Sequence, residues 1–230
     1  MKVFKFGGAS VNNAERIRKL PEILKVFSGE KLLVVISAMG KTTNALEKVA
    51  EAFYSGNKEK AIELFSRIKQ DHLDIAADLL SSTGWKNLSR LPDFFTEVEW
   101  LLHDRPGRDY DYYYDQIVSI GELLSTSVIS DYLNDCGITN RWMDVRDVFV
   151  TDNQFRAANL DWTRTAEHVR DLVEPCFRDT DLVLTQGFIG STDANENTTL
   201  GREGSDYSAA IFANLLHAAS VTIWKDVEGL

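Results

Sequence analysis

Residues 31–40 read KLLVVISAMG, an unbroken apolar run that ends in small and polar residues. A strand buried on both faces has this pattern, and such strands are typical of parallel sheets covered by helices. Residues 2–10, KVFKFGGAS, form a second apolar run, which ends at two glycines. Helix-forming sequence follows each run, so the chain opens with two strand–helix units. This rhythm predicts an α/β fold.

The remainder of the chain repeats the alternation on either side of a helical stretch. We expect helices at residues 12–27 with a break or kink at Pro21, 42–53, 110–134 with Gly137 as its cap, 161–173 and 205–218, and strands at 139–143, 148–151, 182–186 and 221–225. Residues 58–104 read as a helical insertion, broken at 81–84. We therefore predict one three-layer α/β/α sandwich with a mainly parallel central sheet.

Composition argues against several classes of function. A net charge of −10 on 230 residues argues against a nucleic-acid partner. No run approaches the roughly 18–20 apolar residues that span a bilayer. The first residues contain no secretory segment, so we expect a cytoplasmic protein without a membrane partner. Cys136 and Cys176 are not clustered with each other or with the scattered histidines, so we expect reduced thiols and no protein-ligated metal.

In parallel sheets, ligands bind beyond the carboxyl ends of the strands, which directs attention to the loops there. Gly7 and Gly8 can present consecutive backbone N–H groups to an anion, with Lys5 adding a positive charge. A plain turn beside a surface lysine explains the same residues equally well. The sequence GKTT at 40–43 is not a P-loop, because Val35 stands where that motif needs a glycine.

Three further stretches carry polar side chains with two readings each. The hydroxyls of Ser37, Thr42 and Thr43 suit a small polar substrate or a capped helix start. Glu122 is the single charged residue between positions 116 and 130, which indicates either a buried ion pair or a site for a cation such as an α-amine.

The last of these stretches is TTLGREGSD at 198–206. Ser205 suits a helix N-cap and Asp206 the first helical turn, and capping alone would account for both. Arg202 has no such local explanation. A guanidinium beside glycines suits bidentate binding of a carboxylate.

Six segments occur together in one order: KFGGAS (5–10), SAMGKTTN (37–44), SIGELLS (119–125), GFIGS (187–191), TTLGREGSDYSAA (198–210) and IWKDVEGL (223–230). In this respect the chain resembles aspartate kinases of the amino acid kinase superfamily. The resemblance implies a mainly parallel sheet of eight strands. It also implies ATP-dependent phosphorylation of the L-aspartate β-carboxylate to 4-phospho-L-aspartate, the first step of lysine, threonine and methionine synthesis. Such kinases commonly form homodimers.

The resemblance also implies roles for individual residues. ATP phosphates would be held by Lys5, Phe6, Gly7 and Gly8, with Lys5 near the transferred group. Aspartate would be bound by Thr43, Glu122, Arg202, Gly204 and Ser205, with Ser37 lining its pocket. Asp206 would orient Lys5 or the metal–phosphate cluster, and Lys225 and Asp226 would contact the nucleotide. Mg²⁺ would arrive with ATP rather than occupy a site of its own.

Two departures and the end of the chain qualify this resemblance. Many relatives have glycine in place of Glu203 and threonine in place of Lys225. We expect the catalytic domain to be incomplete at its carboxyl end, without a second phosphate-binding lysine and without the regulatory ACT domains. The alternatives are a nucleotide- or amino-acid-binding module without turnover, or another amino acid kinase such as N-acetylglutamate kinase.

Overall fold

A five-stranded parallel sheet forms the centre of the fold in a computed structural model that describes residues 1–80 and 90–225. The strands lie in the order β3-β4-β2-β1-β7, and each neighbouring pair is parallel. Their bounds are β1 (Lys2–Phe6), β2 (Leu32–Ile36), β3 (Arg141–Met143), β4 (Leu182–Gln186) and β7 (Ser220–Trp224). The predicted class is confirmed, although the described sheet has five strands rather than the eight expected.

The strands are paired so that their carboxyl ends lie at one edge. Phe6 at the end of β1 is opposite Ile36 of β2 and Trp224 of β7, and Ile36 is opposite Gln186 of β4. All five residues of β2 and of β4 are buried, as their apolar sequences predict. The carboxyl ends of these four strands are therefore neighbours in space.

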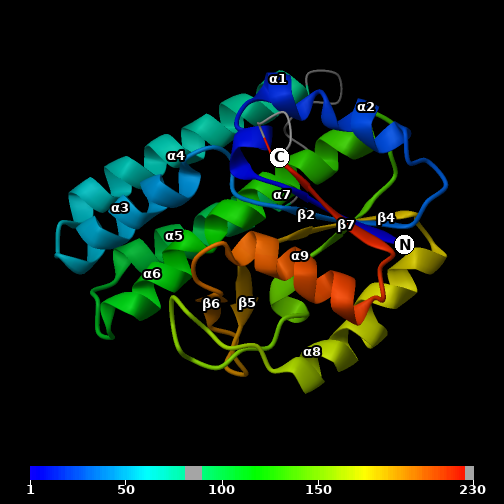
Figure 1. Cartoon of the computed structure of the whole chain (residues 1–230). Helices are drawn as coiled ribbons and strands as arrows, with labels where there is room; N and C mark the ends of the chain where they lie inside the picture. Colours follow the sequence, from blue (N-terminus) through cyan, green and yellow to red (C-terminus); the bar gives the residue numbers. More distant parts are fainter. Residues whose placement is uncertain (81–89, 226–230) are drawn as a thin grey trace.

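Helices cover both faces of the sheet (Figure 1). α7 (Ile120–Asp135) packs on β2, β3 and β4, and α9 (Gly204–Leu215) packs on β1, β2 and β7 from the other side. The other elements are η1 (Gly8–Val11), α1 (Ala14–Ile17), α2 (Leu20–Lys25), α3 (Thr42–Tyr54), α6 (Tyr110–Val118), η3 (Val145–Asp147), α8 (Trp162–His168), η4 (Val169–Val173) and η5 (Glu174–Arg178). The three-layer prediction is confirmed.

The long helical stretch forms α4 (Lys58–Leu79) and α5 (Leu91–His103), with the predicted break at 81–84 lying outside the described residues. α4 packs against α3, and α5 packs against α7. Phe94 of α5 also contacts Trp142 of the edge strand β3, with ring centroids 6.0 Å apart. That these helices are an insertion within the domain stays a prediction.

Two predicted helices are interrupted in the structure. Pro21 lies in the first turn of α2, after α1 has ended, which confirms the break expected there. The predicted helix at 110–134 divides at Ser119 into α6 and α7. The Ser119 hydroxyl donates to the Gln116 carbonyl at 3.4 Å, and such back-bonding by serine bends helices. Gly137 has the left-handed φ of +76° expected after a helix end.

The strand predicted at 148–151 is wrong. Val150 and Thr151 make isolated bridges, to Ser191 and Leu160, outside the central sheet. The apolar run is buried because Phe149 packs on Phe212 of α9, with centroids 4.6 Å apart, so burial rather than strand pairing explains its sequence. A short antiparallel hairpin, β5 (Ile189–Ser191) and β6 (Asn197–Thr199), was not predicted.

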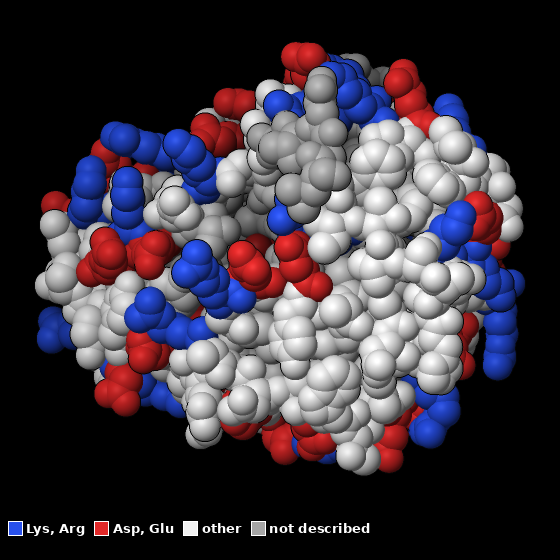
Figure 2. All heavy atoms as spheres, in the orientation of Figure 1, with Lys and Arg blue, Asp and Glu red and all other residues white. Residues whose placement is uncertain are grey.

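The face over α9 and β7 carries few charged side chains (Figure 2). β7 lies at the edge of the sheet, and Val221 and Ile223 are each 42% exposed. Among the described residues, no helix is both long and apolar enough to span a membrane.

Candidate active site

A cleft of about 640 Å³ lies at the edge where the strands end. Ten residues predicted for the site line it: Lys5, Gly8, Ser37, Thr43, Glu122, Arg202, Gly204, Ser205, Asp206 and Lys225. They come from β1, from the segments after β1, β2 and β7, from α3 and α7, and from the start of α9 with the residues just before it. The fold therefore brings together residues that are up to 220 positions apart in the sequence (5 to 225).

Three predicted residues are not among those lining the cleft. The Phe6 side chain is buried and stacks on Trp224, with centroids 5.7 Å apart, so its side chain faces the core. The Gly7 N–H donates to the Trp224 carbonyl at 3.3 Å, which ties the loop after β1 to the end of β7. Asp226 lies outside the described residues.

Gly8 is the point where the loops after β1 and β2 touch. A Cβ at Gly8 would lie 2.5 Å from the Ala38 carbonyl oxygen, which is too close for any side chain. The Gly40 N–H donates to the Gly8 carbonyl at 2.9 Å. Glycine is required here by close approach, since Gly8 itself is not among the residues with positive φ.

Lys5 points from β1 into the cleft and meets Asp206 of α9. Its Nζ lies 2.6 Å from Asp206 Oδ1, and Lys225 Nζ lies 3.7 Å from Oδ2 of the same carboxylate. Lys5 is 8% exposed, while the Lys225 side chain is 59% exposed. One carboxylate thus lies between two cations, of which Lys5 is fixed by burial and by its place in β1, an interior strand of the sheet.

Glu122 is 3% exposed and lies on the side of α7 that faces the loop after β2. Its Oε1 accepts the Ala38 N–H at 3.2 Å, while its Oε2 has no hydrogen-bond partner among the described residues. Burial raises the pKa of Glu122 to about 8, opposed by the Ala38 N–H and the charge of Lys5. The site therefore holds a buried carboxyl group with one oxygen available to a ligand.

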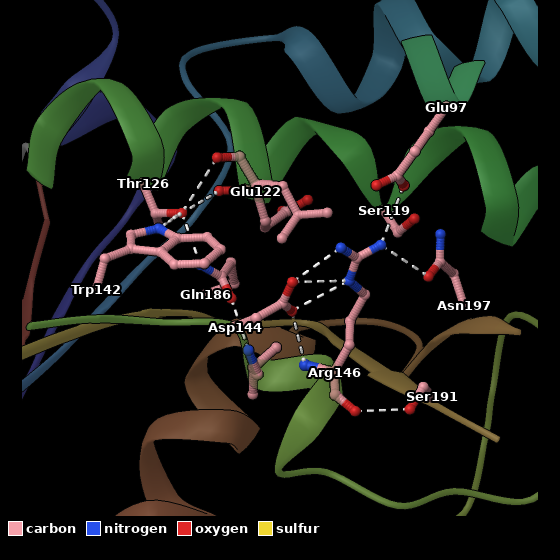
Figure 3. A network of polar contacts seen from close by, with 12 residues as sticks. Glu97, Ser119, Glu122, Thr126, Trp142, Asp144, Arg146, Gln186, Ser191 and Asn197 are labelled. Carbon is pink, nitrogen blue, oxygen red and sulfur yellow. Dashed lines mark hydrogen bonds and ion pairs between the residues drawn. The ribbon is translucent and has the colours of Figure 1, made fainter. Parts of the chain in front are cut away.

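A hydrogen-bond network fixes the helix that carries Glu122 (Figure 3). The Thr126 hydroxyl donates to the Glu122 carbonyl at 2.8 Å and accepts from Gln186 at 2.7 Å and from Trp142 at 3.0 Å. The Gln186 side-chain oxygen accepts the Val145 N–H at 2.8 Å. These bonds tie α7 to β3 and β4 at Thr126, about one helical turn from Glu122.

A second network, centred on Arg146, supports the β5–β6 hairpin (Figure 3). The guanidinium makes a bidentate pair with Asp144 and also contacts Glu97 at 3.1 Å and Asn197 at 3.2 Å. The Arg146 carbonyl accepts the Ser191 hydroxyl at 2.6 Å. The strand β6 that leads to Arg202 is therefore anchored from both α5 and η3.

The start of α9 differs from the prediction at one residue. Glu203, with a left-handed φ of +58°, is the N-cap, and Ser205 lies inside the first turn. The Ser205 N-cap prediction is wrong, because the helix already begins at Gly204. A Cβ at Gly204 would lie 2.7 Å from the Phe188 ring, so close approach requires glycine there. Arg202 precedes this turn, is exposed, and makes no hydrogen bond or ion pair with any described residue.

Nine cleft residues were not predicted for the site: Ala38, Gly40, Asn44, Tyr114, Arg156, Phe188, Thr199, Gly201 and Glu203. Seven of them lie within the sequence segments singled out above, whereas Tyr114 and Arg156 do not. Asn44 adjoins Thr43 and could have been included from the motif. Tyr114 and Arg156 come from α6 and from an irregular loop, and no local pattern marks them. Asp115, which is fully buried, joins these two regions through hydrogen bonds to Arg156 and Thr199.

The fold and this site define a class of protein. The sequence matches the amino acid kinase family over residues 1–230, so the chain belongs to that family.

Within the family it is similar to aspartokinases. It is 33% identical to the lysine-sensitive aspartokinase 3 of Escherichia coli K12, over 99% of this chain and 49% of that protein. It is 31% identical to the chloroplastic bifunctional aspartokinase/homoserine dehydrogenase 2 of Arabidopsis thaliana, over 99% of this chain and 25% of that protein. The crystal structure of E. coli aspartokinase III in complex with aspartate and ADP superimposes with a TM-score of 0.83 at 34% identity, covering 100% and 50% of the two chains.

The chain thus spans about a quarter to a half of the length of these relatives.

Proposed function

We propose that this chain is the catalytic domain of an aspartate kinase. In the reaction an oxygen of the L-aspartate β-carboxylate attacks the γ-phosphorus of ATP, the bond to the β,γ-bridging oxygen breaks, and 4-phospho-L-aspartate and ADP leave. The observation that carries the proposal is one cleft that holds Lys5 and Asp206 together with the buried Glu122. The same cleft holds Arg202, which has no partner among the described residues. The likeness to aspartokinases, including one with aspartate and ADP bound, supports it.

The residue types in the cleft suit phosphoryl transfer to a carboxylate. A carboxylate of pKa about 4 is already ionised at neutral pH, so the reaction needs no general base. Two negatively charged reactants must instead be aligned and their charge neutralised. Lys5 and the backbone around Gly8 would contact the phosphates, and Asp206 would orient Lys5. Lys225, with Asp226, would contact the nucleotide.

Glu122 selects an acceptor with a free amine. Its uncompensated carboxyl oxygen would bind the α-ammonium of aspartate, and Arg202 would bind a carboxylate, with Ser37, Thr43, Gly204 and Ser205 lining the pocket. An N-acetylated amino acid has no ammonium group to pair with a buried carboxylate. This argues against the N-acetylglutamate kinase alternative.

The carboxylate in the cleft is compatible with Mg²⁺ that binds together with ATP. In kinase sites one or two carboxylates and the substrate phosphates hold the ion. Asp206, which lies beside Lys5, would supply such a carboxylate. No cluster of three or more His, Cys, Asp or Glu suited to a metal occurs among the described residues. When bound, the ion would neutralise charge on the phosphates.

Turnover in the complete protein tests the proposal. We expect aspartate to stimulate ATP hydrolysis or transfer, and glutamate and N-acetylglutamate to leave it unchanged. Calorimetry with Mg-ATP and aspartate should show binding of both ligands. Binding without any turnover would favour the alternative of a binding module, and stimulation by N-acetylglutamate alone would contradict the assignment.

Residues 1–230 as a single catalytic domain, the homodimer and the cytoplasmic location stay predictions. Several plant relatives are named as chloroplastic proteins, so relatives differ in location.

A further inference from the structure

Arg156 has a backbone conformation that arginine rarely adopts. Its φ is +68°, in the left-handed region where a Cβ crowds the backbone. Such residues persist when their surroundings hold them, and they gather at sites that bind ligands. Arg156 lines the cleft, although it belongs to no motif of the sequence.

The segment with Arg156 is fixed to the segment that leads to Arg202. The buried Asp115 carboxylate accepts the Arg156 N–H at 2.9 Å, the Thr199 N–H at 2.8 Å and the Thr199 hydroxyl at 2.7 Å. A Cβ at Gly201 would lie 3.2 Å from the Arg156 carbonyl oxygen. The two arginines are thus carried by segments that touch and share one buried anchor.

The Arg156 guanidinium keeps most of its donors available. It stacks over the Tyr114 ring, 4.5 Å from the centroid, and Tyr114 also lines the cleft. Its Nη1 lies 3.1 Å from Asp111 Oδ1, but both side chains are about half exposed, at 44% and 55%, and such surface pairs hold weakly. A guanidinium has five N–H donors, so a ligand carboxylate can still be bound.

The cations of the cleft fall into two groups. Lys5 and Lys225 contact Asp206, on the side proposed for phosphates. Arg156 and Arg202 lie on the touching segments described above. If the β-carboxylate of aspartate meets Lys5 and its ammonium meets Glu122, the α-carboxylate remains for the arginines.

We propose that Arg156 is a specificity-determining residue that binds the non-reacting α-carboxylate of the acceptor together with Arg202. This inference rests on the proposed function. It assigns the preference for an amino dicarboxylate to two guanidinium groups rather than to Arg202 alone.

The test compares Arg156→Gly and Arg156→Lys with the wild type in the complete protein. Glycine suits the left-handed backbone, so the fold should be retained. We expect the KM for aspartate to rise about 10- to 100-fold in Arg156→Gly, as for loss of a charge-assisted contact, with kcat within about twofold. Arg156→Lys should recover part of the loss, because it keeps the charge without the fork.

Binding of β-alanine, which is aspartate without its α-carboxylate, separates binding from support of the loop. The Kd of β-alanine should be the same in wild type and Arg156→Gly, so the preference for aspartate over β-alanine falls. An equal loss for both ligands would make Arg156 a loop support and overturn the inference, as would an unchanged KM. If the wild type does not phosphorylate aspartate at all, the proposed function fails instead.

His217→Gly is the matched control. His217 also has a left-handed φ, of +50°, but it is exposed and is not among the residues lining the cleft. Glycine there should relieve the same kind of backbone strain and leave the KM for aspartate unchanged. A rise in KM in this control would show that strain relief, and not the lost guanidinium, produces the effect.

Discussion

Glu122 combines deep burial with a carboxyl oxygen, Oε2, that has no hydrogen-bond partner in the described part of the chain. The protonation of this group links stability to ligand binding. Burial raises the pKa of Glu122 to about 8, so in the empty cleft near pH 7 the carboxyl group is mostly protonated. An ammonium ligand requires the ionised form. Glu122 therefore lowers the stability of the ligand-free protein and contributes to ligand binding. This pattern is expected of a binding residue rather than of a structural ion pair.

Glu122→Gln should make the empty protein more stable. The unfolded glutamate ionises near pH 4.5 and the folded one near 8, so the wild type loses stability as pH rises between these values. Glutamine does not titrate, so its advantage should be absent near pH 4.5 and reach about 2 kcal/mol or more at pH 8. Urea unfolding at both pH values measures this. A variant less stable at pH 8 would contradict the burial argument, and the variant should also lose aspartate binding.

Lys5→Met should remove catalysis while keeping the fold, since the side-chain volume is similar and Lys5 is buried at the end of a central strand. We expect kcat to fall by about 10³-fold or more, because a fixed cation at the transferred phosphate is lost. Lys2→Met, on the same strand at its opposite end, is the control and should have ordinary activity. Near-normal turnover of Lys5→Met would rule out the assigned role.

Among the elements that form the site, the loops after β1 and β4 have positions that depend on close approach. The loops after β1 and β2 touch at Gly8, and the end of β4 touches α9 at Gly187, where a Cβ would lie 2.7 Å from the Ser205 Cα. Both contacts are with backbone atoms, which cannot move aside as a flexible side chain can. The sequence shows the glycines, but only the assembled sheet shows what each one meets.

Gly8→Ala should disturb the loop after β1, which is proposed to contact the ATP phosphates. Its Cβ would clash with the Ala38 carbonyl, and we expect about 1–3 kcal/mol of destabilisation and a weaker affinity for ATP. Gly107→Ala is the control, because no atom lies within 4 Å of its added Cβ and its φ is not positive. Thermal unfolding and ATP titration of both variants measure the effect. Unchanged ATP affinity in Gly8→Ala would contradict the placement of the loop.

Sequence patterns predicted the elements that are marked by their own apolar residues. They missed the elements whose positions depend on contacts with residues far away in the sequence. β1, β2 and β4 were predicted because each is a compact apolar run. The β5–β6 hairpin escaped because its second strand is Asn-Thr-Thr, whose polar side chains are paired within the protein. Arg156 escaped for the same reason, since its position depends on Asp115, 41 residues away.

At the scale of the whole molecule, the cleft joins an amino-terminal half, with Lys5, Gly8 and Thr43, to a carboxyl-terminal half, with Arg202 and Asp206. The parallel sheet makes this possible because it aligns the ends of β1, β2, β4 and β7. The sequence motifs predicted the site residues of both halves. They could not predict the distances between the side chains of one half and those of the other. Lys5 and Asp206 lie 2.6 Å apart because α9, which carries Asp206, packs on β1, which carries Lys5.

Trapping of the acyl phosphate tests the central claim most directly. Hydroxylamine converts an acyl phosphate to a hydroxamate, so the complete protein should form aspartate β-hydroxamate from ATP and L-aspartate. We expect none from glutamate, from N-acetylglutamate or with Lys5→Met. A hydroxamate from N-acetylglutamate, or no hydroxamate from aspartate although both ligands bind, would contradict the account.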